Sequence, residues 1–92
     1  MKKSAQLTRT TTVSARAILA TNIVKLRGEL GYSQEKLALE AGLHRTFVAH
    51  VERRARNISL DNVERLAIAL QVQVHELLTP VETDRKSYPQ SG

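Results

Sequence analysis

The stretch from Ser33 to Arg56 constrains the fold more than any other part of the chain, because its residues specify two short helices and a tight turn. The first helix has one face whose members recur at i, i+3, i+4 and i+7. That face begins with the polar Gln34 and is otherwise apolar, consisting of Leu37, Ala38 and Ala41. Gly42 ends this helix, since glycine adopts the left-handed backbone of a helix end without strain, and Leu43 fills the turn. The sequence therefore predicts a helix, a turn and a second helix.

The second helix of this pair, from about Arg45 to Arg53, divides into a polar and an apolar face when its residues are placed about 100° apart. The polar face consists of Arg45, Thr46, Ala49, His50 and Arg53, and the apolar face of Phe47, Val48 and Val51. Because Ala49 is small, no bulky side chain inside the polar face keeps the helix from the floor of a groove. The polar face therefore suits a helix that lies in the major groove of DNA.

Three more helices are predicted around this pair, so the expected fold class is all-α, a bundle of five short helices. The first begins after Ser14, ends at Gly31 and has the apolar spacing of Leu19, Ile23, Leu26 and Leu30. The fourth begins after Ser59 and has an apolar stripe formed by Leu60, Val63, Leu66, Ala67 and Leu70. A short fifth helix spans about Val74 to Leu78 and ends before Pro80.

Basic residues are unevenly distributed along the chain, which has a formal net charge of +5. Six lysines and arginines and no acidic residue precede Glu29, and four arginines accompany Glu52 alone between Arg45 and Arg56. Clustered positive charge in a small domain favours a nucleic-acid partner. Charge alone does not separate such a protein from one whose surface is merely basic.

Composition argues against several other classes of protein. The 92 residues suffice for one small domain, and without cysteine neither disulfides nor thiolate metal sites are expected. The three histidines form no H-x-x-x-H pair, so we expect no metal and no other cofactor. No apolar run is long enough for a membrane span and no signal peptide is evident, which predicts a cytoplasmic protein without a membrane partner. An enzyme is not expected, because no nucleophile–base set, phosphate loop or catalytic acid pair occurs.

The predicted domain organisation is a flexible basic arm at residues 1–13, a helical domain at residues 14–79 and a flexible tail at residues 80–92. The arm has no hydrophobic period and is rich in threonine. Two interpretations of it stay open: it follows phosphates or enters a minor groove, or it is a solvated tail. No second domain is predicted that could sense a small-molecule ligand, so no such ligand is expected.

Several short runs together resemble one known family: Leu26-Arg27, Gly31-Tyr32-Ser33-Gln34, Leu37-Ala38, Ala41-Gly42, Val51-Glu52-Arg53 and Ser59 to Leu70. Over about Ala20 to Leu78 the chain is similar to the Cro/C1-type helix-turn-helix domain, also called the XRE family. The resemblance implies a lambda-repressor-like fold and sequence-specific binding to double-stranded DNA. Within the family, the controller proteins of restriction–modification systems are most similar in His44-Arg45-Thr46-Phe47, Glu52-Arg53 and Arg56-Asn57.

The resemblance implies base-reading positions at Arg45, Thr46 and His50. The planar fork of arginine suits the O6 and N7 atoms of guanine, and the methyl and hydroxyl of threonine suit a thymine edge. His50 matches a base-facing position, but an exposed helix histidine is often without a role, so both interpretations stay open. Phe47 borders the apolar face, where packing is favoured over a DNA contact.

Contacts to the DNA backbone are implied for Ser33, Gln34, His44, Arg53, Arg54 and Arg56. Gln34 matches a position that binds a phosphate and braces the recognition helix; its alternative role is a plain polar helix start. His44 is expected to cap the recognition helix, with a phosphate contact as the second interpretation. The arginines are expected to clamp phosphates, with simple solvation as the alternative.

Glu52 and Arg27 match two family positions that form a structural ion pair, so we expect a partly buried salt bridge between the first and third helices. The chain departs from the family where Arg54 and Gln71 replace a common glycine and Ile58 replaces a common proline. A left-handed backbone at Arg54 would cost about 1 kcal/mol.

These features predict a transcriptional regulator, such as a repressor or controller protein, that acts as a homodimer on two half-sites about 34 Å apart. Occupancy would follow protein concentration, as in autoregulation. Leu77 and Leu78 are candidate anchors of the dimer, with completion of the monomer core as the alternative. The second hypothesis is an antitoxin or protein-bridging module that binds DNA secondarily through the same helix pair.

Overall fold

The computed structural model describes residues 14–55 and 57–81. Within these residues there are five helices and no strand: α2 (Ala15–Leu30), α3 (Gln34–Ala41), α4 (Arg45–Glu52), α5 (Leu60–Leu70) and α6 (Val74–Leu77). The all-α, five-helix prediction is therefore confirmed. In this part of the chain no helix combines the length and apolar character needed to cross a membrane. The predicted arm, nearly all of the predicted tail, and Arg56 lie outside the described residues.

Serine hydroxyls cap the beginnings of α2, α3 and α5, where the first backbone amides of a helix have no helical partner. Ser14, Ser33 and Ser59 each accept a hydrogen bond from the amide three residues further on, at 3.1, 2.9 and 3.1 Å. At the other end of α2 and α3, Gly31 and Gly42 have φ angles of 73° and 71°, the left-handed region that closes a helix. These local interactions explain why the helix bounds follow the sequence signals.

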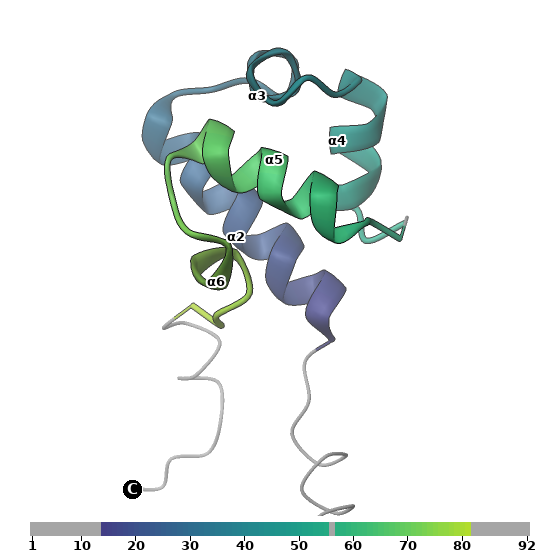
Figure 1. Ribbon diagram of the computed structural model, residues 1–92, viewed down its shortest axis with the longest axis vertical. Helices are drawn as coiled ribbons and strands as arrows, with labels where there is room; N and C mark the ends of the chain where they lie inside the picture. Colours follow the sequence, from purple (N-terminus) through teal and green to yellow (C-terminus); the bar gives the residue numbers. More distant parts are fainter. Residues whose placement is uncertain (1–13, 56, 82–92) are drawn as a thin grey trace, which may run out of the picture.

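The helix pair α3–α4 is held on the three remaining helices by one core. In Figure 1, α2 runs diagonally behind α5, with α3 and α4 above it and α6 below. α2 contacts α4, α5 and α6, and α3 packs on both α4 and α5. The largest fully buried side chains come one from each helix: Ile23, Leu37, Val48, Leu66 and Leu77. Each helix is therefore fastened to the core by at least one complete aliphatic side chain.

A buried polar side chain, Asn22, fastens α2 to the end of α6. Its Nδ2 donates to the carbonyl oxygens of Leu77 and Thr79, both at 2.9 Å. Because the last carbonyls of a helix have no helical partner, the bond to Leu77 satisfies an acceptor that the four-residue α6 leaves open, and the bond to Thr79 holds the chain just after the helix. Asn22 thus closes the end of α6 from a different helix.

Two leucines lie elsewhere than the sequence pattern predicts. Leu77 is 0% exposed, so its predicted role as a dimer anchor is wrong and the alternative, completion of the monomer core, is correct. Leu78, the other candidate anchor, is 40% exposed. Leu60 was expected in the buried stripe of α5 but is 76% exposed, because it is the first residue of the helix and projects beyond the core.

Candidate nucleic-acid interface

The exposed side of α4 carries the residues predicted to read bases. Arg45 and Thr46 are exposed in its first turn, and His50 is partly exposed one turn later. On the opposite side Val48 and Val51 are buried, at 0% and 3% exposure. The helix therefore keeps its apolar face in the core and presents its polar face to solvent.

The beginning of α4 is suited to a negatively charged group. His44 occupies the cap position, as predicted, but its side chain forms no capping hydrogen bond. The first amides of a helix lack helical partners and carry a partial positive charge, and both properties favour a phosphate.

Glu52 joins the end of α4 to both α2 and α3. Its Oε2 accepts from Nε of Arg27 at 2.8 Å, and its Oε1 accepts from the same guanidinium at 3.1 Å. Oε1 also accepts from Nε2 of Gln34 at 2.8 Å. Arg27 further donates to the carbonyl of Tyr32, in the turn before α3, at 2.9 Å. The ion pair expected from the sequence is present, with the Arg27 side chain 21% exposed and that of Glu52 7% exposed.

This network fixes the last turn of α4 relative to α3. An arginine that binds both oxygens of a carboxylate constrains its direction as well as its distance. Gln34 donates one amide hydrogen to Glu52, and its second N–H and its oxygen form no hydrogen bond with the residues that the structure describes. Gln34, the first residue of α3, therefore supports the end of α4 through its hydrogen bond to Glu52.

Phe47 marks the edge of the exposed face of α4. It is partly buried and packs against the core cluster, as the sequence interpretation favoured. Its neighbour Thr46 is exposed. The boundary between core and outer face therefore runs between these two residues.

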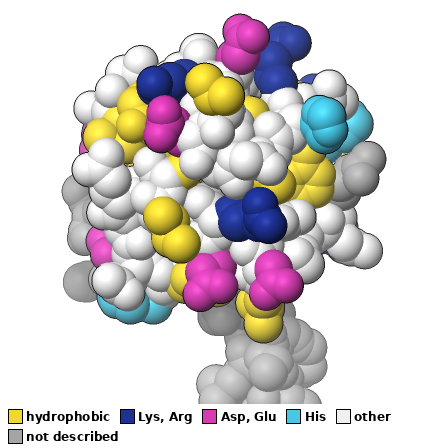
Figure 2. Space-filling model, turned by 45° about the horizontal axis from the view of Figure 1, so that its top comes forward, with side chains coloured by type: hydrophobic (Ala, Val, Ile, Leu, Met, Phe, Trp, Pro, Cys, Tyr) yellow, Lys and Arg dark blue, Asp and Glu magenta, His cyan; other side chains and the backbone are white. Residues whose placement is uncertain are grey.

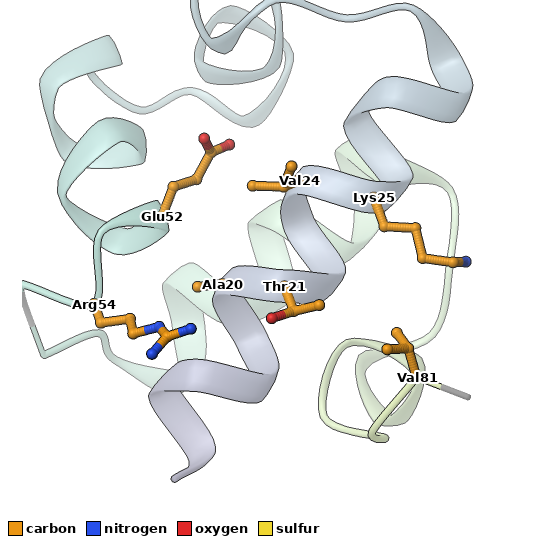
Figure 3. Close-up of a pocket in the computed structure, with 7 residues that line it drawn as sticks. All are labelled: Ala20, Thr21, Val24, Lys25, Glu52, Arg54 and Val81. Atoms are coloured by element: carbon orange, nitrogen blue, oxygen red, sulfur yellow. The ribbon is translucent and has the colours of Figure 1, made fainter. Parts of the chain in front are cut away.

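The two arginines that follow α4 have different surroundings. Arg53 occupies the C-cap position and is exposed. Arg54 has a φ angle of 62°, in the left-handed region that a Cβ disfavours, so the strain anticipated from the sequence is present. Its side chain turns toward α2 and lines a groove of about 470 Å³ with Thr21, Val24 and Lys25 (Figure 3). Arg54 thus adds positive charge beside α2, away from the polar face of α4.

Lys36, in the first turn of α3, is a basic residue near Gln34 that the sequence interpretation missed. Its Nζ lies 3.1 Å from a carboxylate oxygen of Glu40 and 5.7 Å from the ring centre of Tyr32. The hydrogen bond and the negative charge of Glu40 raise the pKa of Lys36 above its ordinary value. The lysine is therefore charged at neutral pH, and its i, i+4 spacing from Glu40 was the sequence signal that could have shown the pair.

Basic and histidine side chains are exposed on and near α4. In Figure 2, histidine (cyan) and basic (dark blue) side chains lie near one another at the upper right, on the side where α4 lies in Figure 1. Hydrophobic side chains elsewhere on this face are interspersed with acidic and basic ones. The exposed arginines at the two ends of α4, Arg45 and Arg53, carry the charge opposite to that of the DNA backbone.

A family model described as helix-turn-helix matches residues 23–77, more than half of the chain. The chain belongs to this helix-turn-helix family, and the XRE-type resemblance seen in its sequence is confirmed. The Neisseria hypothetical transcription factor from Neisseria meningitidis serogroup B is 49% identical over 65 residues, which are 71% of this chain and 61% of that protein. Control protein C.BamHI from Bacillus amyloliquefaciens is 56% identical over 46 residues, which are 50% of this chain and 57% of that protein. The chain thus spans less than two thirds of the length of these two relatives.

Solved structures share the fold. The crystal structure of the Neisseria factor has 44% identity and a TM-score of 0.74, with 82% of this chain and 86% of that chain covered. The restriction-modification controller protein C.AhdI from Aeromonas hydrophila has 42% identity and a TM-score of 0.65, covering 67% and 94%. SinR in complex with DNA, described as the master regulator for biofilm formation, has 34% identity and a TM-score of 0.63, covering 66% and 98%.

Proposed function

We propose that the protein is a sequence-specific transcriptional regulator that places α4 in the major groove of DNA. The observation that carries this proposal is the exposed polar face of α4 on a helix whose other face is buried and whose end is fixed by Glu52. Rigid support matters because bases are distinguished by hydrogen bonds of about 3 Å with defined directions. The likeness to SinR, which was solved in complex with DNA, supports the same kind of partner.

Base reading is assigned to Arg45 and Thr46, with His50 one turn further along the same face. The remaining N–H of Gln34 and the open beginning of α4 at His44 would bind backbone phosphates on one side of the groove. The hydroxyl of Ser33 already accepts the amide of Lys36, so it contributes to the backbone as a donor. Two further residues are proposed as cations along the backbone, Arg53 and Arg56. The side chain of Arg54, for which the sequence implied the same role, lies beside α2 instead.

A homodimer on two half-sites follows from the size of the interface. One α4 contacts few base pairs, and two copies on half-sites about 34 Å apart would supply the missing specificity. The likeness to control protein C.BamHI and to the restriction-modification controller protein C.AhdI supports a regulatory role. With autoregulation, occupancy of the site would follow protein concentration. The place of action is then the cytoplasm, where the gene and its product meet.

Arg45→Ala tests the proposal. Its affinity for a selected site should fall by roughly 1–3 kcal/mol, or about 5- to 150-fold, while its affinity for unrelated DNA changes little. Arg65→Ala is the matched control, because it removes the same charge from an exposed position on α5. Gel-shift titrations on the selected site and on random duplexes give both values. An equal loss on the two DNAs would show that Arg45 does not read bases.

A further inference from the structure

The groove of about 470 Å³ beside α2, named the α2 groove below, combines positive charge with apolar surface. Figure 3 shows Arg54 on one side of it and Lys25 on the other, with Thr21 of α2 between them. Ala20 and Val24 supply apolar lining, and Val24 is 45% exposed. Apolar surface between two cations is complementary to a segment in which acidic residues stand on both sides of an apolar one.

Arg54 has a strained backbone, and its side chain has no partner in the described part of the chain. Its φ angle of 62° is unfavourable for a residue with a Cβ, whereas glycine would adopt it without strain. The guanidinium forms no hydrogen bond or ion pair with the described residues. Strained backbone conformations gather at functional sites, so this outlier points to a role for the guanidinium outside the domain.

The acids near the α2 groove leave both cations accessible to a partner. Glu52 lines the groove, but both of its carboxylate oxygens accept hydrogen bonds from Arg27. Glu29 lies 3.1 Å from Lys25, and both side chains of this pair are exposed. Exposed pairs of this kind contribute little to stability, so a carboxylate from outside can replace Glu29.

A second hollow of about 500 Å³ adjoins the α2 groove, because Lys25 and Val81 line both. His75 and Glu76 of α6 also line this second hollow, and the Glu76 carboxylate accepts the amide of Gln73 at 2.9 Å. The two hollows together give room to an extended stretch of polypeptide. The phosphates of DNA would gain nothing from the apolar lining, whereas an apolar side chain is stabilised there by burial. The surface therefore favours a protein segment over the DNA backbone.

We propose that the α2 groove binds a segment of another protein in which acidic residues flank an apolar one. The apolar side chain packs on Ala20 and Val24, and the flanking carboxylates bind Arg54 and Lys25. The fork of the arginine can donate two parallel hydrogen bonds to one carboxylate, which fixes the direction of the segment. Because the groove lies away from the polar face of α4, the partner can bind while α4 contacts DNA.

Selection from a phage library of random short peptides, with the whole chain as bait, tests the proposal. The recovered peptides should share an acidic–apolar–acidic pattern, and fluorescence anisotropy measures their affinity. Arg54→Gly should weaken binding by about tenfold or more, the usual effect of losing a hydrogen bond between charged groups. Glycine suits the left-handed backbone at this position, so the fold should persist, and far-UV circular dichroism checks it.

Two variants serve as matched controls. Gln71→Gly introduces glycine at the other left-handed position, where φ is 65°, and Gln71 does not line the groove. Arg53→Ala removes an exposed arginine one position earlier that does not line the groove either. Both variants should bind the selected peptides as the wild type does. In gel shifts, Arg54→Gly should keep the wild-type affinity for DNA, whereas Arg53→Ala should not.

Three outcomes would overturn the proposal. The library could yield no peptides with the acidic–apolar–acidic pattern, as it would if a second copy or another part of this chain filled the groove. Arg54→Gly could bind the selected peptides as tightly as the wild type. Arg54→Gly could also lose as much affinity for DNA as Arg53→Ala, which would assign the guanidinium to a phosphate instead.

Discussion

Replacing Glu52 with alanine tests whether one carboxylate holds the recognition helix to the body of the domain. Glu52→Ala removes the bidentate bond to Arg27 and the bond to Gln34 together. The guanidinium keeps its bond to the Tyr32 carbonyl but loses its counter-ion. Because the Glu52 side chain is only 7% exposed, water does not replace all of what is lost.

The expected magnitude follows from the burial of the two partners. Removing one member of a buried ion pair costs roughly 3–5 kcal/mol. The Arg27 side chain is 21% exposed and can be partly hydrated, which places this case at the lower end, about 3 kcal/mol. For a domain of this size each kcal/mol lowers Tm by about 4–8 °C, so Tm should fall by roughly 12–24 °C.

Thermal unfolding followed by circular dichroism at neutral pH measures this effect. Glu29→Ala is the matched control, since it breaks the exposed i, i+4 pair with Lys25 and should cost about 0.3–0.5 kcal/mol. Glu52→Gln, which keeps the length and one acceptor, should lie between the two. A Tm for Glu52→Ala within about 3 °C of that of Glu29→Ala would refute the reasoning, because 3 °C is less than 1 kcal/mol here.

Three further changes test other parts of the structure. Asn22→Ala leaves the buried Leu77 carbonyl and the partly buried Thr79 carbonyl without this donor and should lower the free energy of unfolding by about 1–3 kcal/mol, measured in urea. Wild-type stability would show that these bonds contribute nothing. Gln71→Gly relieves a φ angle of 65° and should raise stability by roughly 0.5–1 kcal/mol, and a lower urea midpoint would contradict this. Arg53→Ala should weaken binding to all duplexes alike and reduce the slope of log K against log salt by about 0.9, whereas an unchanged slope would exclude a phosphate contact.

The helix bounds could be predicted from the sequence because the signals that set them are local. Ser33 and Ser59 bind amides three residues away, and Gly31 and Gly42 adopt the left-handed backbone where α2 and α3 end. None of these interactions depends on how the helices pack. The polar face of α4 was predictable for a related reason, since apolar residues at helical spacing define the buried side.

Interactions between residues far apart in the sequence were harder to predict from the sequence. Asn22 interrupts the apolar spacing of α2, which could have marked it, but its acceptors lie 55 and 57 positions away and are backbone carbonyls without a sequence signal. The Arg27–Glu52 pair was expected only through the family resemblance. Leu77 and Leu78 are chemically identical neighbours. Leu77, the last residue of α6, is buried in the core, whereas Leu78, the residue after the helix, is exposed.

At the candidate site, the direction of the Arg54 side chain could not be predicted from the sequence either. Its side chain lies beside α2 because one residue has a left-handed φ angle, which composition does not reveal. The bond from Gln34 to Glu52 likewise requires the packed positions of α3 and α4. Sequence reasoning therefore defined which residues lie on the outer face of α4, whereas the structure defined what holds that face in place.

Selection of bound sequences from a random pool of DNA duplexes tests the central claim most directly. The wild-type chain should enrich two related half-sites whose centres lie about 34 Å, one turn of DNA, apart. With Arg45→Ala, the preference at one base position in each half-site should be lost while the spacing is kept. Recovered sequences that share no motif and bind no more tightly than the starting pool would contradict the assignment of α4 as a recognition helix.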